Sequence, residues 1–298
     1  LLLFGLFGGM QGVIFNTLMA KVIPVSKRGR LTGLRNFLAG ISAAVVAYLG
    51  GEWLLGQNPD AAGYGYTFLI AFVLTSIGLG SLLFMREPEP PLVRPRQSLW
   101  ATVGELPGLM GADPAFARYV LARALATCGR MAMPFYIVYA STQMDITGQK
   151  LAVLTIGFTL AGTISNLLWG AIADRSGFRR VFLLSIALWL LATTALAITS
   201  ALWMLLLVFV GVGAAAQGFQ HSSMNLTLEF GRREDVPQRI AVANTTSELA
   251  GAIAPVAGGL LAASFGYGTM FTVAMALLLC GGLLVVLYVP EPRFAAAH

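Results

Sequence analysis

The chain has 298 residues, of which 57% are hydrophobic and only 11% are charged, and its formal net charge is +6. Its mean hydropathy is +0.78, whereas charged residues make up roughly a quarter of an ordinary soluble domain. This composition excludes a soluble globular protein. The cations lie in short loops between apolar runs, so a membrane explains the positive charge better than nucleic acid does.

The apolar residues form long blocks along the whole chain. Each block has about 20 residues or more, the length that a helix needs to cross a hydrocarbon core of about 30 Å. We therefore predict an all-α polytopic membrane protein. The predicted spans are residues 1–20, 31–55, 65–85, 116–142, 150–172, 180–199, 201–228, 239–264 and 267–289.

The third and fourth spans are separated by a longer segment that begins REPEPPLVRPR. A stretch so rich in Pro and charge cannot form a helix in a bilayer. We predict three regions: the last three helices of a first half at 1–85, a central linker at 86–115, and a complete six-helix second half at 116–298.

Of the 19 Lys and Arg residues, sixteen, Arg239 among them, fall on one side of the membrane, Lys150 falls on the other, and Arg123 and Arg130 lie within a span. Because short cytoplasmic loops carry an excess of Lys and Arg, the side with the sixteen cations is predicted to be cytoplasmic. The linker and the C-terminus are then cytoplasmic, and the protein is predicted to lie in a plasma membrane, cytoplasmic or inner.

An internal repeat relates the first three spans to the last three. FLAGISAAV (37–45) aligns with ELAGAIAPV (248–256), and YGYTF (64–68) resembles FGYGTMF (265–271). Fixed-offset similarity of this kind indicates a duplicated structural unit. The middle three spans have no counterpart, so we expect three further helices before Leu1 in a pseudo-symmetric bundle of twelve.

A dense cluster of charge follows the fifth predicted span, in the sequence GAIADRSGFRR (170–180). Together with the six-helix halves, this turn resembles the G-x-x-x-D-R-x-G-R-R loop of the major facilitator superfamily of secondary transporters, of which the chain would cover helices four to twelve. Phe178 departs from the pattern at the first basic position. The matching residues are Gly170, Asp174, Arg175, Gly177, Arg179 and Arg180.

The resemblance implies a cytoplasmic gate at this turn. The carboxylate of Asp174 would face the N-terminus of the helix that follows KRGRLTG (27–33), where backbone N–H groups and the helix dipole favour an anion. Arg175 would pair with Glu229. The alternative is that these residues only anchor the loop and follow the positive-inside rule.

Two arginines lie inside the span 116–142. An Arg at the centre of a membrane helix costs about 2.5–3.5 kcal/mol even on the lenient insertion scale, so it usually faces a partner or a wet cavity. Tyr119, Arg123 and Arg130 lie close to one helix face, and the resemblance implies that this helix lines a cavity. We predict that Arg130 contacts substrate near the midplane, and that Arg123 contributes there or to the gate.

Polar residues also occur inside two later spans. Gln217, His221 and Asn225 lie on or beside one face of the span 201–228, and histidine is the side chain whose ordinary pKa lies near neutral pH, so His221 is a candidate proton carrier. Glu248, the acid deep within a span, shares a helix face with Asn244. We favour a charge pair between Glu248 and one of the arginines over a proton-carrying role.

We predict a secondary active transporter that moves a small solute by alternating access with proton coupling, in the bilayer and as a monomer. Arg130 favours a solute with an anionic or polar group, and uptake and efflux both stay open. The alternative is a non-transporting sensor or assembly protein of the same fold. The sequence shows no paired catalytic carboxylates, no metal-ligand cluster and no cofactor motif, so we expect no enzyme, metal, cofactor or nucleic-acid partner.

Overall fold

The computed structural model describes residues 11–12, 14–15, 18–19, 22–49, 61–84, 108–199, 201–231 and 235–291. These residues are helical or lie in short connections, and none of them forms a strand. The predicted all-α polytopic fold is confirmed. Most of the first predicted span and most of the linker lie outside the described residues, so the number of nine spans stays a prediction.

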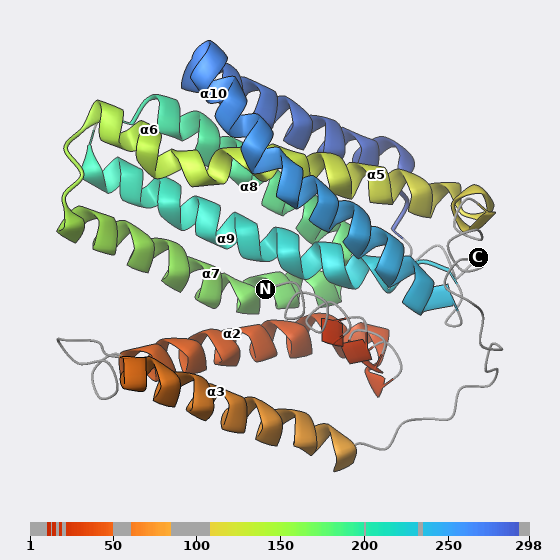
Figure 1. Cartoon of the computed structure of the whole chain (residues 1–298). Coiled ribbons are helices and arrows are strands. Elements are labelled where there is room, and N and C mark those ends of the chain that lie inside the picture. Colours follow the sequence, from red (N-terminus) through yellow and green to blue (C-terminus); the bar gives the residue numbers. More distant parts are fainter. Residues whose placement is uncertain are drawn as a thin grey trace.

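The helices of the first region form a layer beside the main bundle (Figure 1). Helix α2 covers Val25–Leu49, and α3 covers Ala61–Ser81 with a short 3-10 turn, η2, at Leu82–Phe84. Helix α2 packs against α7, while α3 lies on the far side of α2 (Figure 1). The chain enters the main bundle at residues 108–112, which are helical.

The fourth predicted span is a broken helix. It consists of α5 (Pro114–Gly129), a 3-10 segment η3 (Arg130–Phe135) and α6 (Tyr136–Gln143). Pro134 lies within η3; it has no N–H to donate and its ring crowds the carbonyl of residue 130. The α-helical geometry therefore changes at Arg130, in the middle of the span.

The remaining spans agree closely with the prediction. Helices α7 (Gly148–Ser176), α8 (Phe178–Ala197) and α9 (Leu202–Thr227) follow in order. Helix α10 (Val236–Tyr288) contains Gly266 with a φ of 81°, where two helices meet. The break falls between the predicted spans 239–264 and 267–289.

Large apolar side chains occupy both the interior and the outer faces. Trp189, Phe182 and Phe116 are 0% exposed, whereas Leu191 and Leu260 are 67% and 66% exposed. Among the described residues, four helices are long and apolar enough to cross a bilayer: Gln149–Ser176, Phe178–Ala197, Leu202–Thr227 and Val236–Tyr288. The exposed apolar faces are those that lipid would cover.

The backbones of α2 and α7 approach each other closely where both helices carry glycine. A Cβ built on Gly170 would lie 2.6 Å from the carbonyl oxygen of Gly29, and one on Gly33 would collide with the carbonyl oxygen of Asn166. Small residues allow such contacts between membrane helices. The α2–α7 crossing therefore depends on the absence of side chains at these positions.

We predict that Gly33→Ala lowers the midpoint of thermal unfolding of the purified protein in detergent. The new Cβ would meet the Asn166 carbonyl and lie 3.2 Å from the Cα of Gly170, and such overpacking costs about 1–3 kcal/mol. The matched control is Gly78→Ala in α3, where a Cβ meets nothing within 4 Å. Equal midpoints for Gly33→Ala and the unmutated protein would contradict the close crossing.

Candidate transport cavity and gate

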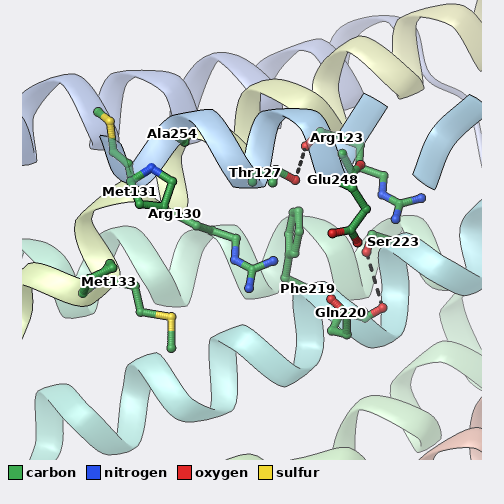
Figure 2. Close-up of a pocket in the computed structure, with 14 residues that line it drawn as sticks. Arg123, Thr127, Arg130, Met131, Met133, Phe219, Gln220, Ser223, Glu248 and Ala254 are labelled. Atoms are coloured by element: carbon green, nitrogen blue, oxygen red, sulfur yellow. Dashed lines mark hydrogen bonds between the residues drawn. The ribbon is translucent and has the colours of Figure 1, made fainter. Parts of the chain in front are cut away.

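A cavity of about 340 Å³ lies between the α5–η3 junction, α9 and the first part of α10 (Figure 2). Four of its lining residues carry a charge or an amide: Arg123, Arg130, Gln220 and Glu248. Its volume falls within the range of small-molecule sites, about 300–1,000 Å³. The side chains that close it include Met131, Phe219, Ser223 and Pro255.

Arg130 projects into this cavity from the point where α5 changes to 3-10 geometry (Figure 2). Its guanidinium carbon lies 5.5 Å from the ring centroid of Phe219 and 5.7 Å from that of Trp189. Within the described part of the chain, the guanidinium makes no hydrogen bond or ion pair. The two aromatic faces thus support the cation and leave its N–H donors available to an occupant.

Arg123 is held by the protein itself. Its Nη1 donates to the Thr227 hydroxyl at 3.3 Å, and its Nη2 donates to the side-chain oxygen of Asn244 at 3.0 Å. The Tyr119 hydroxyl donates to the carbonyl of Ser223 and lies 3.4 Å from the Thr227 hydroxyl oxygen. Arg123 is only 7% exposed. These contacts join α5, α9 and α10 beside the cavity.

Glu248 lines the cavity from α10 (Figure 2). In the described part of the chain its carboxylate makes no hydrogen bond and no ion pair with Arg123 or Arg130. The favoured charge pair is therefore not formed in this structure. The reason is that Asn244 and Thr227 engage Arg123, while the rings of Phe219 and Trp189 hold Arg130.

The α9 residues singled out in the sequence lie outside the cavity lining. Gln217 faces α7, because a Cβ on Gly162 would lie 3.0 Å from its Cγ. His221 is 2% exposed, and its ring centroid lies 5.7 Å from that of Phe178. The Asn225 side chain donates to the carbonyl of His221 in its own helix at 2.8 Å.

The adjacent face of α9 lines the cavity instead, through Phe219, Gln220 and Ser223. The sequence did contain a signal for this face, because Gln220, Ser223 and Thr227 recur at i, i+3 and i+7. Gln220 was expected beside the face of Gln217 and His221, and the cavity lies on the Gln220 side of the helix.

Asp174 does meet the first part of α2. One carboxylate oxygen accepts the backbone N–H of Gly29 at 2.7 Å, and the other accepts the backbone N–H of Arg30 at 2.8 Å. The helix begins earlier than the sequence indicated, at Val25, so these N–H groups belong to its second turn. Gly170 lies against Gly29 in the same crossing.

The rest of the charged turn fastens α7 and α8 to the end of α10. Gly177 has a φ of 85°, and a Cβ there would collide with the side chain of Glu291. The Arg179 side chain donates to the carbonyls of Val285 at 3.2 Å and Val286 at 2.9 Å. A cation beside the last carbonyls of a helix is favoured by the helix dipole.

One expected gate contact is absent from the described part of the structure. Arg175 is exposed and forms no ion pair with Glu229. Arg180 is also exposed. A second polar contact between α2 and α7 was not predicted: the Asn36 side chain donates to the side-chain oxygen of Asn166 at 3.4 Å.

An ion pair that the sequence did not indicate joins the starts of α5 and α10. One oxygen of Asp113 accepts the N–H of Phe116 at 2.9 Å and caps α5, and the other lies 2.7 Å from Nη1 of Arg239. The guanidinium of Arg239 also lies over the ring of Phe116 at 4.6 Å. Arg239 had been treated only as a topology-determining cation.

The apolar helices and the charged lining of the cavity define a polytopic helical membrane protein with a polar interior site. The chain belongs to the Major Facilitator Superfamily, because that family's model matches residues 119–298. Multi-pass membrane location follows from the family and from the apolar helices. No curated protein matches the sequence.

Solved structures of transporters share this fold at low sequence identity. A point variant of the E. coli fucose:proton symporter FucP has a TM-score of 0.70 and 14% identity, over 95% of this chain and 73% of that protein. An outward-facing bacterial homologue of the iron transporter ferroportin has a TM-score of 0.68 and 16% identity, over 90% of this chain and 66% of that one. The same homologue with soaked iron has a TM-score of 0.63 and 15% identity, over 90% and 65%. The chain thus spans slightly less than two thirds of the ferroportin homologue.

We predict that Asp113→Asn lowers the free energy of unfolding by about 1–3 kcal/mol, because it leaves the buried Arg239 guanidinium without its anion. The Asn amide oxygen can still cap α5, so the loss reports the ion pair. The control is Asp145→Asn, which removes the same charge from an exposed residue whose side chain has no hydrogen bond or ion pair in the described part of the chain. Equal denaturation midpoints for the two variants would show that the pair contributes nothing.

Proposed function

We propose that this protein is a secondary active transporter that moves a small solute across the membrane by alternating access. The observation that supports it most directly is the cavity into which Arg130 and Glu248 both project. A structural bundle gains nothing from such groups, because charges within a membrane are costly unless a partner or water satisfies them. Transporters of this class place their solute sites at discontinuous helices, and Arg130 lies at such a break.

We propose that Asp174 closes the cytoplasmic end of the pathway by holding α2. The contact joins α2, which the sequence assigns to the first half, with α7 of the second half. The gate would consist of Gly170, Asp174, Gly177 and Arg179, with Arg175, Arg180 and Glu229 at its edge. Release of two charge-assisted hydrogen bonds would let the halves part at that end.

We further propose that transport is coupled to protons and that Glu248 is the coupling group. This carboxylate lines the cavity, whereas His221 lies outside its lining and is buried. FucP, which shares the fold, is described as a proton symporter. Proton coupling through Glu248 is compatible with uptake of the solute and with its efflux.

The proposed setting follows the sequence. The regions 1–85, 86–115 and 116–298 would be the two halves and their linker, with the linker and the C-terminus in the cytoplasm. The protein would act as a monomer in a cytoplasmic or inner membrane.

Reconstitution into liposomes tests the function. A panel of labelled sugars, amino acids, organic acids and metal ions is offered with and without an imposed pH gradient. We predict uptake of at least one class, and a fall of about tenfold or more for Arg130→Gln, because a lost charge-assisted contact costs about 2–5 kcal/mol. Arg118→Gln, an exposed cation in α5 outside the cavity, should transport normally. A folded protein that moves no solute in the panel would favour the non-transporting class.

Crosslinking tests the gate. Arg30→Cys and Ala171→Cys, which line one cleft between α2 and α7, are combined after Cys128 and Cys280 are replaced by Ser. We predict that a short thiol crosslinker joins them and stops transport reversibly. Arg30→Cys with Lys150→Cys, near the opposite end of α7, serves as the control. The absence of any Arg30–Ala171 crosslink, with and without solute, would remove the gate role.

A further inference from the structure

Besides Arg123, which the protein holds by hydrogen bonds, the cavity is lined by two opposite charges that are not paired with each other. Arg130 enters from the α5–η3 junction and Glu248 from α10, and both line the same space of about 340 Å³ (Figure 2). No ion pair joins them in the described part of the chain. Both groups are therefore open to an occupant at the same time.

The surrounding contacts explain why the two charges remain apart. The rings of Phe219 and Trp189 hold the Arg130 guanidinium between 5.5 and 5.7 Å from their centroids. Figure 2 shows the Phe219 ring between the Arg130 guanidinium and the Glu248 side chain. The neighbouring Arg123 is already bonded to Asn244 and Thr227, which fix its guanidinium and use two of its donor groups but leave its charge unneutralised.

We propose that the transported solute is a small zwitterion, with a carboxylate that binds the Arg130 guanidinium and an ammonium group that binds the Glu248 carboxylate. The inference rests on the proposed transport function and names its substrate class. A guanidinium presents a planar fork of donors that matches a carboxylate, and a carboxylate accepts the donors of an ammonium group.

Other charge types fit the cavity less well. A simple anion on Arg130 would lie in the same small space as the Glu248 carboxylate, and a simple cation on Glu248 would meet the Arg130 guanidinium. A neutral solute would remove water from both charges and neutralise neither, which is unfavourable. Like-charge contacts and unpaired charges of this kind are how a site rejects the wrong ligand.

The uncharged part of the solute would contact an apolar wall. Met131, Met133 and Pro255 line the cavity together with the Phe219 ring. Methionine side chains adapt to ligands of different shape. The proposed class is therefore an amino acid or a related amino carboxylate with an apolar body.

Compounds with one six-carbon skeleton test the charge requirement. Norleucine and 6-aminohexanoate carry both charges, hexanoate carries only the carboxylate, and hexylamine only the ammonium group. For each of the four compounds we measure competition with the uptake of a labelled solute from the liposome panel. We also measure how far each compound raises the thermal stability of the purified protein. We expect at least one zwitterion to bind about tenfold or more tightly than either singly charged compound, since a charged hydrogen bond contributes about 1.5–3 kcal/mol.

Two variants test which side chain binds which charge of the solute. The readout is the preference among the four compounds, and not loss of activity alone. Glu248→Gln should remove the preference for the zwitterion over hexanoate, and Arg130→Gln should remove its preference over hexylamine. Arg118→Gln, outside the cavity, should keep both preferences. A variant that fails to fold is recognised because it shows no cooperative thermal transition. In that case Glu248→Asp provides the second test, because it keeps the carboxylate and should retain the preference for the zwitterion over hexanoate.

The outcomes separate this inference from the proposed function. Binding of hexanoate as tight as that of both zwitterions, or an unchanged preference in Glu248→Gln, would overturn the inference. Transport of a sugar or metal ion with no effect of any zwitterion would also overturn it, while the transport function stands. If no solute in either panel moves, the transport function itself fails.

Discussion

The guanidinium of Arg130 must be accommodated within a chain whose surroundings are apolar, and this requirement organises the second half of the molecule. Placement at the membrane centre is unfavourable unless water, a ring face or an anion is at hand. The structure supplies two aromatic faces and an open cavity at this position. Pro134 supplies the geometry, because the change to 3-10 winding begins at Arg130 itself. Discontinuous helices are common at the solute sites of membrane carriers, near the bilayer midplane.

The cavity and the charged turn lie on different helices, yet both depend on α9. This helix carries Phe219 and Ser223 on the cavity side and packs closely against α7, the helix that ends in the charged turn. A Cβ on Gly213 of α9 would collide with the carbonyl of Phe158 in α7. Movement of α7 relative to α2 would therefore be transmitted to the cavity wall through a tightly packed pair of helices. Packed elements of this kind shift between discrete arrangements more readily than they deform.

Hydropathy predicts where the helices lie in the sequence, but it does not predict which face of each helix lines the cavity. The spans 150–172, 180–199 and 201–228 correspond to α7, α8 and α9 within a few residues, because each needs about 20 apolar residues to cross a bilayer. The Asp174 contact with α2 followed from the resemblance of the charged turn to the family's loop, and helix electrostatics explains why it is favourable. Gln217, His221 and Asn225 were expected along the pathway but lie outside the cavity lining, because neighbouring faces of a helix differ by only one residue in register. The Asp113–Arg239 pair joins residues far apart in the chain, and no local pattern marks such a pair.

Asp113 gives α5 and α10 a shared pivot. Its carboxylate caps the first turn of α5 and holds Arg239 in the first turns of α10. At 1.5 Å per residue, Arg130 lies about 25 Å along α5 from this point, and Glu248 about 20 Å along α10 from its own start. If either helix rotated by about 5° around this ion pair, the side chain at its far end would move by about 2 Å over such a length. A displacement of that size makes or breaks a hydrogen bond, so a rotation at Asp113 would change the contacts that Arg130 and Glu248 can make in the cavity.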